Sequence, residues 1–149
     1  MSMDDIKAFL GTWTLVSYEA RDSTGRVQYP LGEHVTGQLI YDAGGNMSVH
    51  IMRLDRPIFA SRDSMQGTDT EVRAAFEGHA SYFGTYMIDP IKQTLTHHVK
   101  GASYPNWIGS DQLRCYKFDA LQMRDPRKGC SRRRFRFISN TGGIMSNLL

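Results

Sequence analysis

Short runs of aromatic and β-branched residues recur along this chain roughly every ten residues, with turn-forming residues between them. Such spacing is typical of an antiparallel sheet, because hairpin strands need only short connections. A parallel βαβ fold would instead need a helical crossover of about a dozen residues or more between successive strands. We therefore predict an all-β protein, a closed antiparallel eight-stranded barrel with a short N-terminal helix and one lid helix.

Eight or nine segments have the composition that favours β-strands. We expect strands at residues 12–20, 27–29, 37–41, 47–54, 82–88, 94–102, 112–118, 121–124 and 134–139. A Gly-Gly turn at 42–46 joins two of these strands into a hairpin. A barrel of eight strands has an interior just large enough for one small ligand. The predicted fold is therefore compatible with a ligand-binding protein.

Two short helices are expected beside the strands. The first spans residues 4–10 and stops at Gly11. The second begins at Thr68, where a capping box pairs the Thr68 hydroxyl with the Glu71 backbone and the Glu71 carboxylate with the Thr68 backbone. This helix continues to Gly78 and is expected to cover one opening of the barrel as a lid.

The charge of the chain is concentrated at one end. The 149 residues fit a single domain and carry a net charge of +3. Residues 1–118 are faintly acidic, whereas residues 119–149 hold seven basic and two acidic side chains. Because this basic segment has no nucleic-acid motif and no aromatic stacking platform, we interpret it as a solvated loop between strands. No nucleic-acid partner is expected.

The rest of the composition indicates a cytoplasmic protein. The N-terminal residues 1–5 contain neither the basic nor the apolar region of a secretory signal. No apolar run is long enough to span a membrane, and two cysteines are too few for a disulfide scaffold. We expect no membrane partner and a protein that is a monomer or a homodimer.

Several sequence blocks together resemble one known family. In chain order they are Gly11-Thr-Trp-Thr-Leu-Val-Ser-Tyr-Glu19, Tyr29-Pro-Leu-Gly32, Gly37-Gln-Leu-Ile-Tyr41, Gly45-Asn-Met-Ser-Val49, Met52-Arg53, Arg56-Pro57, Ala75-Phe-Glu-Gly78, Tyr82-Phe-Gly-Thr-Tyr86, His97-His-Val99, Pro105-Asn-Trp-Ile-Gly109 and Asp111-Gln112. Over residues 8–124 this order is similar to the small lipocalin-like domain family of bacteria and fungi. The segment 124–149 departs from the family, which closes with a Thr-Pro-rich turn and a hydrophobic last strand.

The resemblance implies a stand-alone barrel that holds a small molecule. Members are often encoded beside secondary-metabolite or degradative enzymes, and some barrels in such pathways act as cofactor-free cyclases or isomerases. In lipocalins and fatty-acid-binding proteins the Gly-x-Trp indole plugs the closed end of the barrel, and an arginine of the last strand stacks on it. The resemblance therefore assigns Trp13 to that plug and Arg134 or Arg136 to the stack.

His97 is the first candidate for chemistry. On a strand, alternate side chains share a face, so His97 lies with Leu95 and Val99 and points inward, whereas His98 points outward. An imidazole titrates near neutral pH and can act as an acid or a base. The alternative is an interior histidine that is hydrogen-bonded to a tyrosine of a neighbouring strand.

Tyr82, Tyr86 and Arg53 complete the candidate catalytic set. The two tyrosines share a strand face, and their hydroxyls could orient a carbonyl or phenol, although ordinary packing would also explain them. Arg53 at the barrel mouth could hold a carboxylate or enolate, or form only a salt bridge at the rim. Further ligand contacts are expected from Tyr41, His50, Met52, Phe83, Trp107, Arg114 and Tyr116.

The sequence carries no motif for a cofactor or a metal. The five histidines have no paired ligand spacing, and the sequence contains no P-loop, dinucleotide fingerprint or nucleophile elbow. We therefore expect no cofactor and no metal. Two functions remain, either a cofactor-independent cyclase, isomerase or dehydratase, or a binding protein that carries a small, mostly apolar organic molecule without changing it.

Overall fold

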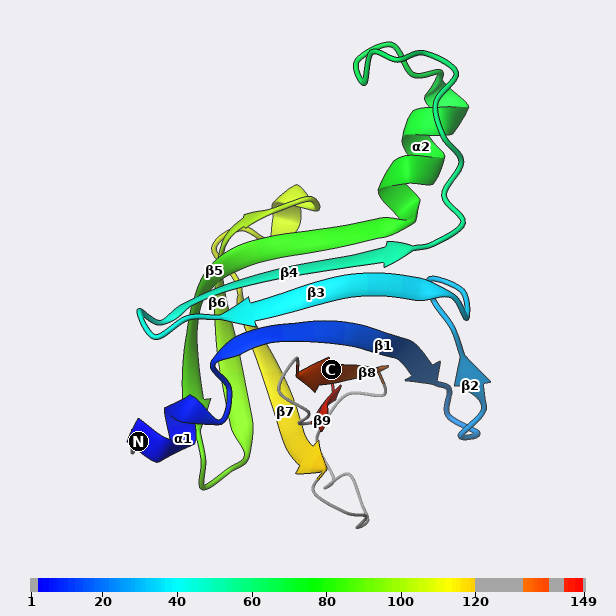
Figure 1. Ribbon diagram of the computed structural model, residues 1–149. Coiled ribbons are helices and arrows are strands. Elements are labelled where there is room, and N and C mark those ends of the chain that lie inside the picture. The colour runs from blue at the N-terminus through cyan, green and yellow to red at the C-terminus, as the bar shows by residue number, and fades with distance from the viewer. Residues whose placement is uncertain (1–2, 120–132, 140–143, 149) are drawn as a thin grey trace.

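The computed structural model describes residues 3–119, 133–139 and 144–148, and most of them lie in β-strands (Figure 1). The strands are β1 (Gly11–Arg21), β2 (Val27–Gln28), β3 (Val35–Tyr41), β4 (Asn46–Arg53), β5 (His79–Asp89), β6 (Thr94–Ala102), β7 (Asp111–Asp119), β8 (Arg133–Ser139) and β9 (Ile144–Leu148). The helices are α1 (Met3–Lys7), α2 (Asp69–Glu77) and the 3₁₀ turn η1 (Pro105–Trp107).

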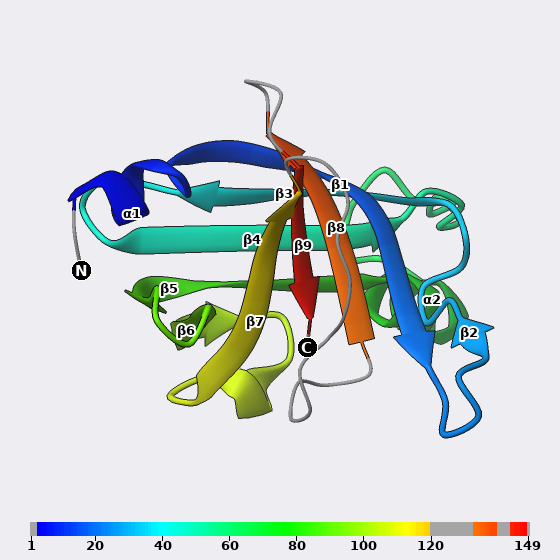
Figure 2. The same ribbon diagram turned by 90° about the horizontal axis from the view of Figure 1, so that it is seen from below.

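The strands form one curled antiparallel sheet. Its order is β2-β1-β3-β4-β5-β6-β7-β9-β8, and β1 also pairs with β8. Figure 2 shows β7, β9 and β8 running steeply across the direction of β3, β4 and β5. The long strand β1 bends between these two directions and pairs with β3 through its first residues and with β8 along most of its length. The curl encloses an interior face.

Most predicted strands are found within three residues of their predicted ends. No strand is predicted at β9, because its Ser- and Asn-containing segment lacks a strong β pattern. It forms a strand through pairing with β7 and β8. The predicted strand at 121–124 lies outside the described residues. Helix α2 begins with both hydrogen bonds of the predicted capping box, at Thr68 and Glu71. Helix α1 ends earlier than expected, at Lys7.

An aromatic cluster fills the interior at the α1 end. Phe9 follows α1 and packs edge-on against Tyr41 and Tyr116, and its carbonyl accepts a 2.8 Å hydrogen bond from the Trp13 indole. The backbone register places Ser139 opposite Trp13, whereas Arg136 and Arg134 lie opposite Ser17 and Glu19, further along β1. Among the described contacts, the indole donates to the backbone of Phe9 and its ring lies 6.0 Å from that of Phe118, whereas the predicted arginine stack lies outside the described side chains.

Helix α2 extends away from the sheet beyond the ends of β4 and β5 (Figure 1). The Arg56 side chain ties it to the body, because it donates to the carbonyl of Ala75 and contacts the sulfur of Met52. The helix buries none of its residues and contributes none to the cavity described below, so the structure does not place it over that cavity. Among the described helices, none has the length and apolar character needed to cross a membrane.

Candidate ligand-binding cavity

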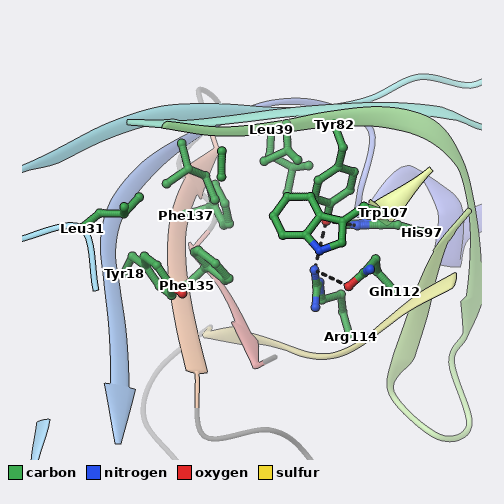
Figure 3. A pocket seen from close by; sticks show the side chains of 13 residues that line it. Tyr18, Leu31, Leu39, Tyr82, His97, Trp107, Gln112, Arg114, Phe135 and Phe137 are labelled. Carbon is green, nitrogen blue, oxygen red and sulfur yellow. Dashed lines mark hydrogen bonds between the residues drawn. The ribbon is translucent and has the colours of Figure 1, made fainter. Parts of the chain in front are cut away.

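The curled sheet encloses a cavity of about 540 Å³. This volume lies within the range of small-molecule sites. Figure 3 shows the cavity with its side chains as sticks. It is lined by Tyr18, Leu31, Leu39, Val49, Ile51, Ala80, Tyr82, His97, Trp107, Gln112, Arg114, Phe135 and Phe137.

One wall of the cavity is apolar. We call it the apolar wall, and it consists of Tyr18, Leu31, Leu39, Val49, Ile51, Phe135 and Phe137. The alternation of β3 and β4 turns Leu39, Val49 and Ile51 to the interior, where they are buried. Pairing of β8 with β1 brings the Phe135 ring onto Tyr18, with 4.2 Å between the ring centroids. This wall offers hydrophobic and aromatic surface to a ligand.

Another part of the lining is polar. We call it the polar wall, and it consists of Tyr82, His97, Gln112 and Arg114, with Trp107 at its edge (Figure 3). These side chains come from β5, β6 and β7, where the register sets His97 beside Gln112 and Arg114 beside Leu95. The lining of the cavity therefore holds the cationic side chain of Arg114 together with the aromatic rings of Tyr82 and Trp107.

Hydrogen bonds connect the members of the polar wall. The Tyr82 hydroxyl lies 2.7 Å from Nδ1 of His97 and accepts a 3.2 Å hydrogen bond from Arg114. Arg114 also donates, at 3.4 Å, to the side-chain carbonyl of Gln112. Behind His97, the Tyr41 hydroxyl lies 2.8 Å from Nε2. Both ring nitrogens of His97 are thus occupied by tyrosine hydroxyls, which corresponds to the interior histidine that the sequence left as one alternative.

His97 is neutral at physiological pH. It is 1% exposed, and burial, together with the charges of Arg114 and His98, lowers its pKa from 6.5 to about 3. Burial also raises the pKa of Tyr41 well above its usual value, so that hydroxyl keeps its proton. The buried part of this network is therefore uncharged and holds a fixed number of protons.

Trp107 lies at the rim, on the turn η1. Its ring packs edge-on against Tyr82 at 5.9 Å and against Tyr104 at 5.4 Å. Ser110 donates to the Trp107 carbonyl at 2.6 Å and accepts from the Gln112 side chain at 3.0 Å. The rim loop is thus connected to the polar wall, and the Trp107 ring is part of the cavity lining.

The structure brings together four of the residues singled out from the sequence. Tyr82, His97, Trp107 and Arg114 line the cavity, and Tyr41 supports His97 from behind. Their convergence depends on three neighbouring strands in one register.

Other candidates lie outside the cavity lining. His50 and Met52 alternate with the buried Val49 and Ile51, so they belong to the outer face of β4. Arg53 is exposed and donates to Asp55 at 2.9 Å.

The remaining candidates from the sequence are also displaced from the cavity. Phe83 follows Tyr82 on β5 and is 57% exposed. Tyr86 lies nearer the α1 end, where its hydroxyl donates to the carbonyl of Asp42. Tyr116 packs against Phe9. Alternation predicts which face of the sheet a side chain lies on. Its position along the strand decides whether it reaches the cavity.

Sequence reasoning named no residue of the apolar wall as a ligand contact. Leu39, Val49 and Ile51 could have been found from the alternation of the 37–54 hairpin. Leu31 follows Pro30 in a loop, and no local pattern marks it. Phe135 and Phe137 reach the cavity through pairing of β8 with β1, which is a contact distant in sequence. Within the described segments, no three metal-ligating side chains gather into a site for a metal ion.

Comparison with known proteins now identifies the class to which this fold and cavity belong. The family model of the lipocalin-like domain matches residues 10–139, so the chain belongs to that family, and the resemblance seen in the sequence is confirmed. A relative from Aspergillus oryzae is 32% identical over 85 residues, which cover 52% of this chain and 77% of that protein. It is named 4'-hydroxy-3'-methoxypropiophenone carrier protein.

Proposed function

We propose that this protein binds and carries a small, mostly apolar aromatic molecule that has one polar end. The observation that carries the proposal is one cavity of about 540 Å³ whose lining combines the apolar wall with the polar wall. Sites for small molecules combine apolar surface with a few placed polar groups that fix orientation. The ligand body would lie on Phe135 and Phe137, and its polar end would face Tyr82 and Arg114 (Figure 3).

The named ligand of the Aspergillus oryzae relative supports this class of molecule. A 4'-hydroxy-3'-methoxypropiophenone is an aryl ketone, with an aromatic body and oxygen substituents. We therefore propose an aryl ketone or a molecule of similar shape as the ligand. We also propose that the curled sheet works as a closed eight-stranded barrel, because β1 pairs with β8 and β9 joins β8 to β7.

Carrying is favoured over catalysis by the state of His97. A general base needs a free lone pair within reach of the substrate and a pKa near the working pH. Both ring nitrogens of His97 face tyrosine hydroxyls. Its pKa of about 3 means that the neutral ring is a weak proton acceptor at pH 7. The polar wall is thus arranged to hold a molecule, whereas a cyclase or isomerase would need another proton acceptor.

Calorimetric titration with 4'-hydroxy-3'-methoxypropiophenone tests the proposal. We expect saturable binding at one site per chain, and chromatography should recover the ketone unchanged after prolonged incubation. Ala80→Trp, which puts a large side chain into the cavity lining, should abolish binding. Met87→Trp, on the same strand but 61% exposed, is the matched control and should bind as wild type.

Equal binding by Ala80→Trp and wild type would contradict a ligand in this cavity. If wild type converts the ketone to a new product and Ala80→Trp does not, the protein is an enzyme and the proposed carrier function is wrong.

A further inference from the structure

The hydrogen-bond network behind the cavity determines which way the proton of each member points. This inference rests on the proposed function and specifies what the polar wall recognises. His97 lies between the hydroxyls of Tyr41 and Tyr82, and Arg114 reaches the far side of Tyr82. Because a neutral imidazole has one N–H and one acceptor nitrogen, only two arrangements of protons are possible along this line.

The buried end selects one of these two arrangements. Tyr41 is 1% exposed, and Nε2 of His97 is its hydrogen-bond partner within the described part of the chain. A buried hydroxyl hydrogen without an acceptor is costly, so Tyr41 donates to Nε2. The single proton of the neutral ring then resides on Nδ1. In the opposite arrangement Nε2–H would donate to Tyr41 and leave the Tyr41 hydrogen without an acceptor among the described residues.

The exposed end of the line follows from that choice. With its proton on Nδ1, His97 donates to the Tyr82 oxygen at 2.7 Å. Arg114 donates to the same oxygen at 3.2 Å. Two donors therefore point at the Tyr82 oxygen, and its own hydrogen is left to point elsewhere. Tyr82 lines the cavity, so that hydrogen is available to a ligand.

We propose that Tyr82 is the specificity-determining donor of the cavity and selects ligands that present a carbonyl oxygen to it. The donors His97 and Arg114 polarise the hydroxyl in the same direction, which strengthens the hydrogen bond that it gives. Arg114 adds positive charge beside the same position, and no described carboxylate forms an ion pair with it. The side-chain carbonyl of Gln112, a nearby acceptor, already accepts a hydrogen bond from Arg114. The polar wall thus offers donors, and Tyr41 and His97 are positioning residues.

The proton arrangement is measured directly in the ligand-free protein. Long-range ¹H–¹⁵N NMR distinguishes a protonated from an unprotonated ring nitrogen, and we expect His97 to be protonated on Nδ1 at pH 7. This measurement needs no variant and no ligand. A proton on Nε2 instead would overturn the proposal.

Selection of a carbonyl is tested with propiophenone and propylbenzene, which share a phenyl ring and a three-carbon chain. Calorimetry gives the ratio of their affinities, and comparing this ratio between proteins cancels the different hydration of the two probes. We expect Tyr82→Phe to lower the ketone-to-hydrocarbon ratio by about tenfold, because one polarised hydrogen bond is lost. Tyr86→Phe, whose hydroxyl donates to Asp42 away from the cavity, should keep the wild-type ratio.

Tyr41→Phe tests the positioning role. It removes the donor to Nε2 while Tyr82 stays, so we expect the NMR spectrum to show loss of the single Nδ1-protonated form and the affinity ratio to fall between wild type and Tyr82→Phe. An unchanged ratio in Tyr82→Phe would overturn the carbonyl proposal, although both probes still bind and the proposed carrier function stands. If wild type binds neither probe and also fails to bind 4'-hydroxy-3'-methoxypropiophenone, the proposed function itself fails.

Discussion

The two walls of the cavity are built in different ways. The apolar wall gathers side chains from β1, β3, β4 and β8, and most of these also belong to the main hydrophobic core. The polar wall comes from β5, β6 and β7, and its side chains are linked by hydrogen bonds. The apolar wall is therefore shared with the hydrophobic core, whereas we propose that the polar wall orients a ligand. Substitutions on the two sides should differ accordingly.

The largest expected effect is a loss of stability from the apolar wall. Phe137→Ala removes a ring that is 2% exposed, so we expect the free energy of unfolding to fall by about 3–5 kcal/mol in urea titrations. Met87→Ala, an exposed position on β5, should change it by less than about 0.5 kcal/mol. A similar small loss in both variants would show that the apolar wall is not part of the folding core.

The second effect is acid destabilisation through the polar wall. The folded pKa of His97 is about 3 against an ordinary 6.5, so below pH 6.5 the unfolded chain takes up a proton that the folded chain refuses. This stabilisation is complete above pH 6.5 and is lost progressively as the pH falls toward 3. Between pH 7 and pH 5 we expect the free energy of unfolding to fall by about 2 kcal/mol.

Urea titrations at the two pH values measure this loss. Burial also lowers the pKa of His79, so this side chain too resists protonation in the folded state, and His79→Gln is the control that separates its share. Stability that is the same at pH 5 and pH 7 in His79→Gln would contradict a buried neutral His97.

The third effect concerns affinity. Arg114→Met keeps a long side chain but removes the charge beside Tyr82, so propiophenone should bind about tenfold more weakly, equivalent to about 1.4 kcal/mol. The free energy of unfolding should change less than in Phe137→Ala. The opposite pattern, with unchanged affinity and a large loss of stability, would assign Arg114 to the core and remove the contrast between the walls.

The smallest effect comes from the neighbour of His97 on the outer face. His98 lies 2.6 Å from Asp111, and both side chains are more than a third exposed. Exposed ion pairs contribute little, so His98→Gln should change the free energy of unfolding by less than about 1 kcal/mol in the same titrations. If His98→Gln instead lowers the free energy of unfolding by about 2 kcal/mol, as expected for wild type between pH 7 and pH 5, the outer face also stabilises the fold.

Alternation along strands explains why parts of the site were predictable. It puts His97 on the same face as Leu95 and Val99, and the structure buries all three. It also puts Tyr82 and Tyr86 on one face, yet these residues lie at different heights and only Tyr82 reaches the cavity. A period of two residues gives the face of a strand but not the depth, which depends on the register between strands.

Contacts between distant segments explain the rest. The strand β9 has no local pattern strong enough to predict it, and its pairing with β7 and β8 makes it a strand. Phe135 and Phe137 appear in the sequence as part of a basic segment, and only the pairing of β8 with β1 turns them into cavity wall. Such tertiary pairing is not encoded in any local window.

Pairing of β1 with β8 also has a consequence for synthesis of the protein. The pairing of β1 with β8 joins residues 13–20 to residues 133–139, and contacts of such large sequence separation carry a high entropic cost of loop closure. During translation, β1 has to wait for β8 to leave the ribosome before it finds that partner. Phe135 and Phe137 arrive with β8, so the cavity of the emerging chain lacks part of its apolar wall before that point. We therefore expect the cavity to be completed only after β8 has been synthesised.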